Sequence, residues 1–239
     1  TLLIFPGNCT LTPVKLDTSN ADTLGHISVS IAVSPLLEQA SNLTRNNEAI
    51  ARYQLNDNVV KKDLFDPQES ADLTTLDYDC RILLGDQQLK QHNQLICFKV
   101  AELMSVGNEY QQDTKFIPQV LTIASSKVLQ GYIKSLKQSL MGRFEQLESF
   151  NSVNVQAADS SNHNVGMLMT LNTLASYIAI FSHFAEMNQS RPADLYLSIR
   201  QLIAQLSVFS KTISVNGETN NNEYSLVPFN EQNLTECFY

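Results

Sequence analysis

Hydrophobic and polar residues alternate along the first half of the chain, which predicts β-strands. The clearest case is segment 27–34, where Ile27, Val29, Ile31 and Val33 alternate with Ser28, Ser30, Ala32 and Ser34. A period of two places one face of a strand against a core and the other in water. Shorter apolar runs, bounded by Gly, Pro and Asn, predict further strands at 2–5, 9–14, 51–55, 80–84, 95–100 and 115–123. Polar loops are expected between them, notably at 38–48 and 66–75.

From about Ser125 the hydrophobic period changes to three or four residues, which predicts helices. A first helix is expected over 127–150, and a polar break over 151–164 precedes a second helix that carries Leu168, Leu171, Leu174, Ile178 and Phe181. A third helix begins at Pro192, because proline suits the first helical turn and Asp194 favours the positive end of the helix dipole. Asn230 is a candidate cap for a fourth helix.

The two periods together predict an α+β protein with more than one domain. We expect an antiparallel β-sandwich-like domain over 1–124 and a helical bundle over 125–239, with its fourth helix cut short. The first residues are already strand-like and the last ones resemble the start of a helix, so we interpret the chain as a piece of a longer protein.

The third helix carries a seam of apolar side chains with heptad-like spacing. Its members are Leu195, Ile199, Leu202, Leu206 and Phe209. Such a stripe is a candidate packing face of the bundle or a contact between subunits. Because a helical stripe in a bundle usually packs first on its own chain, we assign most of this seam to the intrachain core.

Composition narrows the possible functions. A net charge of −8 argues against a nucleic-acid partner, since phosphate binding needs a surplus of Lys and Arg. No apolar run approaches the roughly 20 residues of a membrane-spanning helix, and segment 166–184, interrupted by polar residues, is interpreted as a buried helix. The four cysteines form no CxxC pair and are expected to be free thiols.

Known catalytic patterns are absent from the sequence. It contains no GxxxxGK[ST], GxGxxG or GxSxG motif, and its four histidines are scattered. We therefore predict that the chain is not an enzyme and holds no cofactor and no metal. An alternative is an acid/base site in the β-domain around Asp77, Asp79 and His92, although a solvated strand edge explains the two carboxylates as well.

Three groups of short motifs, in this order along the chain, resemble a known family. The first is a FIPP-x-L-x-I-like segment, which opens with Phe116-Ile117-Pro118. The second is an HPEDLY-like helix start, which contains Pro192-Ala193-Asp194-Leu195-Tyr196. The third is a PYDHDDL-x-x-x-F-like stretch, which includes Pro228, Leu234 and Phe238. By these residues the chain resembles the TssK (ImpJ/VasE) family of type VI secretion baseplate proteins. Gln119 and Arg191 depart from the pattern and make the chain a divergent member.

The resemblance implies an architecture and a function. It implies a shell β-domain, a helical neck and a head, of which this chain would hold most of the shell and the neck. It also implies a homotrimeric structural adaptor, cytoplasmic and docked at the inner membrane. Its shell would bind the TssF and TssG wedge proteins, and its head the inner-membrane complex of TssJ, TssL and TssM. The alternative reading is a phage-type receptor-binding or tail baseplate protein with a similar shell.

Overall fold

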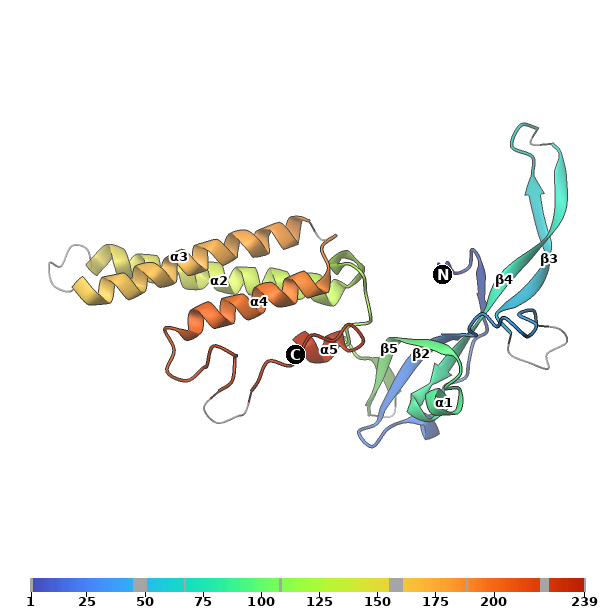
Figure 1. The fold of residues 1–239 in the computed structure, drawn as a ribbon, viewed down its shortest axis with the longest axis horizontal. Coiled ribbons are helices and arrows are strands. Elements are labelled where there is room, and N and C mark those ends of the chain that lie inside the picture. Colours follow the sequence, from blue (N-terminus) through green and yellow to red (C-terminus); the bar gives the residue numbers. More distant parts are fainter. Residues whose placement is uncertain are drawn as a thin grey trace. The chain divides into compact units, whose positions relative to one another are not determined.

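The computed structural model describes residues 2–44, 51–66, 68–107, 109–154, 161–187, 189–219 and 224–238. The chain divides into two compact units, Thr1–Asp113 and Thr114–Tyr239. The first is built on a β-sheet and the second on helices (Figure 1). The α+β class is therefore confirmed, whereas the assignment of 1–124 to a shell and 125–239 to a neck stays a prediction.

In the described residues of the first unit, the strands form one curled, six-stranded sheet in the order β1-β4-β2-β5-β6, with β3 paired to β4 off that path. The strands are β1 (Cys9–Leu11), β2 (His26–Val33), β3 (Tyr53–Lys62), β4 (Ser70–Leu84), β5 (Ile96–Val106) and β6 (Glu109–Gln112). Neighbouring strands are antiparallel except β1, which runs parallel to β4.

The antiparallel sandwich expected from the sequence is not observed in the described residues. The expected strands at 2–5 and 115–123 are not strands, and the loop expected at 66–75 is partly strand, because β4 begins at Ser70. In place of a second sheet, the short helix α1 (Gly85–Gln91) packs against β2 and β4. Its Leu89 contacts a small apolar cluster of Ala32, Leu83 and Leu95.

The serine-bearing face of β2, expected to be wet, is buried. Ser30 exposes 1 % of its surface, and Ser28, Ala32 and Ser34 are buried too. The hydroxyl of Ser28 donates a hydrogen bond to the carboxylate of Asp86 on α1 at 3.1 Å. Small side chains leave room for a helix to lie close to the sheet, and each buried hydroxyl still needs such a partner.

The second unit is formed by α2 (Lys127–Asn154), α3 (Ser161–Glu186), α4 (Pro192–Ser207) and α5 (Leu234–Phe238), with a 3₁₀ turn at Ile123–Ser125. The predicted start at Pro192 is confirmed. The last helix begins later than expected, since Asn233 rather than Asn230 accepts a hydrogen bond from the backbone N–H of Glu236, at 3.3 Å. The break predicted at 151–164 is shorter, and its residues 155–160 lie outside the described ones.

The helices share one apolar core. Helix α3 packs against both α2 and α4, and α4 contacts α5. The most deeply buried side chains of this core come from all four helices: Leu129, Ile133, Phe181, Leu195 and Leu234. Leu140 of α2 and Leu202 of α4 are buried in the same core, and Ile199 and Leu206 of α4 pack against it.

Helix α3 is more apolar than expected. Its segment Val165–Glu186 spans 22 residues and contains an 18-residue window with a mean hydropathy of 1.5, so it is long and apolar enough to cross a membrane by length and composition alone. The expectation that no segment reaches this limit is therefore wrong, because the polar residues that interrupt it are small or uncharged. One face of the helix, with Leu174, Tyr177 and Phe181, packs into the protein core.

Candidate interaction surfaces

The seam of α4 lies mainly in the core of its own chain. Leu195 and Leu202 are buried, and Ile199 and Leu206 are partly buried against the same cluster. Helix α4 ends at Ser207, so Phe209 lies beyond the helix and is 43 % exposed. The structure thus brings four seam residues together and separates the fifth.

Phe209 borders an apolar groove at one end of the helical unit. The groove has a volume of about 520 Å³ and lies between α3 and the end of α4. Its lining includes Val165, Leu168 and Met169 of α3, with Val208 and Phe209 from the segment after α4. All five side chains are exposed. A groove of this composition is suited to contact another apolar surface rather than a charged ligand.

The motif segments that carry the family resemblance meet in the core of the helical unit. Ile117, Tyr196, Leu234 and Phe238 are all buried in one cluster. The ring of Tyr196 packs edge-on against Phe238 with centroids 5.9 Å apart, and its hydroxyl donates a hydrogen bond to the backbone carbonyl of Val227. Burial raises the pKa of the Tyr196 phenol, which keeps this hydroxyl a donor. These residues act as structural ties.

The other motif residues lie around this cluster. Pro192 is buried in the first turn of α4, and Asp194 forms an exposed ion pair with Arg191 at 3.3 Å. Phe116 and Pro118 are half-buried, whereas Pro228 is exposed. An exposed ion pair of this kind contributes little to stability, so Asp194 acts mainly at the positive end of the helix dipole.

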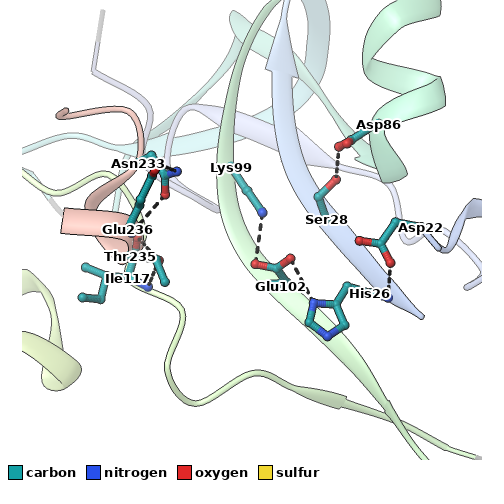
Figure 2. A network of polar contacts seen from close by, with 10 residues as sticks. All are labelled: Asp22, His26, Ser28, Asp86, Lys99, Glu102, Ile117, Asn233, Thr235 and Glu236. Atoms are coloured by element: carbon teal, nitrogen blue, oxygen red, sulfur yellow. Dashed lines mark hydrogen bonds and ion pairs between the residues drawn. The ribbon is translucent and has the colours of Figure 1, made fainter. Parts of the chain in front are cut away.

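A cluster of polar side chains lies in the sheet unit, at a small pocket of about 140 Å³ beside α1 (Figure 2). The carboxylate of Glu102 forms an ion pair with Lys99 at 3.1 Å, and its other oxygen lies 3.5 Å from Nδ1 of His26. Asp22 accepts hydrogen bonds from the backbone N–H groups of Leu24 and His26, both at 2.8 Å, and the backbone bonds lower its pKa. Within the described residues, no group of acidic, Cys or His side chains is arranged to hold a metal ion. These contacts link strands and turns.

The alternative acid/base site is not assembled. Asp77 is buried and accepts a hydrogen bond from Asn56 at 2.9 Å, while Asp79 pairs with Arg81 at 3.5 Å. In the described part of the chain, no hydrogen bond or ion pair joins His92 to either carboxylate. Both carboxylates therefore serve β4 and its neighbours as structural acceptors.

Two of the free cysteines lie together in the sheet. Cys9 and Cys80 belong to one buried cluster between β1 and β4. Burial, with Cys9 as neighbour, raises the pKa of the Cys80 thiol to about 11. A thiol with so high a pKa is a poor nucleophile at neutral pH, so this pair is structural.

Sequence reasoning missed the most exposed apolar feature, a two-stranded ribbon formed by β3 and the first half of β4. In Figure 1 these strands run together away from the rest of their unit. Leu64 and Phe65, in the turn that joins them, are 93 % and 97 % exposed. The signal was Asp66-Pro67, a turn pair between two stretches with strand-forming residues.

Comparisons with known proteins give one family match. Over residues 1–239 the chain matches the family described as "Bacterial Type VI secretion, VC_A0110, EvfL, ImpJ, VasE". A comparison with curated proteins finds no match.

Several solved structures share the fold. A "Crystal structure of TssK" is similar with a TM-score of 0.76 and 21 % identity, over 95 % of this chain and 50 % of that one. "The baseplate complex from the type VI secretion system" gives 0.76 and 22 %, over 95 % and 70 %. The "TssK-TssF-TssG baseplate subcomplex" gives 0.72 and 19 %, over 93 % and 72 %. The chain thus spans half the length of the first of these proteins.

Proposed function

The chain belongs to the bacterial type VI secretion family that includes ImpJ and VasE, and from this premise we propose that it is part of a structural baseplate adaptor. The observation that carries the proposal is the family match over all 239 residues. It favours the secretion adaptor over a phage-type receptor-binding protein. The similarity in fold to TssK structures supports the same reading.

The adaptor acts by geometry and not by a chemical step. In this proposal the sheet unit is the shell that binds the TssF and TssG wedge proteins, and the helical unit is the neck. A head domain carries the contact with the inner-membrane complex of TssJ, TssL and TssM, so the protein lies on the cytoplasmic side and docks at that membrane. Several tethered contacts of moderate affinity then add up to firm attachment.

We further propose that the protein is a homotrimer through its shell and neck. The buried seam residues of α4 already pack against their own chain, so we assign the subunit contact to the exposed end of the seam. This end comprises Phe209 and the groove beside Leu168 and Met169. In a closed ring with threefold symmetry, residues near the axis meet their copies on the other two subunits, so no copy of them stays exposed.

The proposal is tested with the full-length protein. Light scattering is expected to give three times the mass of one chain, and co-expression with TssF and TssG is expected to give a complex that survives gel filtration. A strain that lacks the gene is expected to lose type VI-dependent release of protein, and the intact gene to restore it. A protein that is monomeric, fails to bind TssF–TssG and is dispensable for release would refute the adaptor.

A further inference from the structure

The β3–β4 ribbon exposes apolar side chains along its length as well as at its tip. Leu55 lies opposite Leu76 in the register, and Val60 opposite Asp72, two pairs that point to the same side of the ribbon. Leu55, Val60 and Leu76 are all exposed. Two-stranded ribbons are marginally stable in water on their own, and soluble proteins rarely leave continuous apolar surface uncovered. Such a ribbon gains stability when another surface covers it.

Hydrogen bonds of Asp63 tie the backbone beside Leu64 and Phe65. The carboxylate of Asp63 accepts hydrogen bonds from the backbone N–H groups of Phe65, at 2.6 Å, and Asp66, at 2.9 Å. The backbone N–H of Asp63 donates to the carbonyl of Glu69 at 2.9 Å and closes the turn. The hydrogen bonds from Asp66 and Phe65 lower the pKa of the Asp63 carboxyl, which keeps it charged. The backbone that carries Leu64 and Phe65 is thus restrained before binding, which reduces the entropy lost when they bind.

Negative charge surrounds this apolar tip. Between residues 57 and 72 the ribbon carries five carboxylates (Asp57, Asp63, Asp66, Glu69, Asp72) against Lys61 and Lys62. In the described part of the ribbon, no ion pair joins these lysines to the carboxylates. An acidic rim repels anionic lipid and the equally acidic ribbon of a second copy. It suits a partner of opposite charge.

We propose that the β3–β4 ribbon is a docking arm that inserts Leu64 and Phe65 into an apolar pocket, rimmed by Lys and Arg, on a partner protein. Aromatic side chains that fill such pockets supply a large part of the binding energy, and complementary charges around them give orientation and fast association. The inference rests on the proposed function, because TssF–TssG is the partner with which it is tested.

The first experiment compares the dissociation constants of full-length protein and variants for the TssF–TssG pair. Phe65→Asp is expected to raise the dissociation constant about 30-fold or more, because it places a charge in an apolar pocket. Leu24→Asp is the matched control, since it adds the same charge at an exposed leucine of the same unit and is expected to bind like the unmodified protein. Binding of Phe65→Asp at unmodified strength overturns the arm and leaves the proposed function standing. Failure of the unmodified protein to bind overturns both.

The second experiment tests the charge of the pocket rim. Glu69→Gln and Asp72→Asn remove two carboxylates that accept none of the hydrogen bonds found in the described part of the turn, where Asp63 and Asp66 are the acceptors. The double variant is expected to bind several-fold more weakly at low salt and like the unmodified protein near 1 M salt, where charges are screened beyond about 3 Å. If the double variant binds as tightly as the unmodified protein at low salt, or more tightly, the proposed rim of Lys and Arg on the partner is overturned.

Two further measurements test whether the ribbon instead contacts a second copy of the chain or a lipid surface. Light scattering of Phe65→Asp is expected to give the unmodified mass, and a lower mass would mean that the ribbon contacts a second copy. Vesicles of phosphatidylcholine and phosphatidylserine are expected not to retain the protein. Retention that Phe65→Asp abolishes would assign the tip to lipid instead. Either result overturns the inference.

Discussion

The hydroxyl of Thr235 accepts a hydrogen bond from the backbone N–H of Ile117 at 2.9 Å, across 118 residues of sequence (Figure 2). This bond ties α5 to the segment that precedes α2, and both residues lie in motifs that resemble the type VI family. Ile117 is buried, so its N–H would otherwise be cut off from water. The family motifs in the helical unit therefore encode how its two ends are joined.

We expect Thr235→Val to lower the free energy of unfolding by about 1–3 kcal/mol, because it keeps the shape of the side chain but leaves the N–H of Ile117 without an acceptor. Urea unfolding of the full chain, followed by circular dichroism, measures the change. Thr235→Ser keeps the hydroxyl and is expected to lose clearly less. Equal losses for the two variants would show that the hydrogen bond contributes nothing.

Gly85, at the junction of β4 and α1, is expected to tolerate no side chain. Its φ is +71°, and a Cβ at this position would lie 2.3 Å from the carbonyl oxygen of Asn20. Gly107 has a similar φ of +65° but open space around it. We expect Gly107→Ala to cost about 1 kcal/mol through backbone strain, and Gly85→Ala to cost roughly 1–3 kcal/mol more through overlap. Thermal unfolding of both variants separates the two effects, and similar melting temperatures would contradict the close approach.

The long helices α2, α3 and α4 could be predicted from the sequence because each carries several turns of a regular apolar stripe. The start of α4 is marked twice, by Pro192 and by Asp194, and it lies where predicted. The apolar stripe that begins at Leu195 also indicated which side chains enter the core. The end of that stripe was misplaced at Phe209, because a spacing pattern continues past the residue at which the helix stops.

The sheet unit was harder to predict, since polarity reports exposure and not backbone shape. The residues after Ser70 were interpreted as a loop because they are polar, yet they form β4 in a ribbon with solvent around it. Helix α1 has seven residues, too few to show a helical period, and Gly85-Asp86 resembles a turn. The burial of Ser30 depends on where α1 packs, which no local pattern contains.

The Cys80 thiol predicts a pH dependence of stability. Burial raises its pKa from an ordinary value of 9.0 to about 11 in the folded chain. Between these values the unfolded chain loses the proton and the folded chain keeps it, so stability is full below pH 9 and falls as the pH rises towards 11. Urea unfolding of the full chain between pH 9 and 10 is expected to show this slope, and Cys80→Ala to reduce it. A slope that the substitution leaves unchanged would assign the effect to other groups.

Leu202 tests whether the seam of α4 is an intrachain core or a subunit contact. Its side chain is buried in the cluster that α3 and α4 share, so Leu202→Glu places an unpaired charge where water cannot reach and is expected to cost several kcal/mol. The helical signal at 222 nm should then fall or the protein aggregate. Leu197→Glu, at an exposed leucine of the same helix, is the matched control and should leave stability nearly unchanged. Folded monomers of Leu202→Glu with full helical signal, seen by light scattering and circular dichroism, would instead place the seam between subunits. The expected outcome is loss of helix, because four of the five seam residues already contact their own chain.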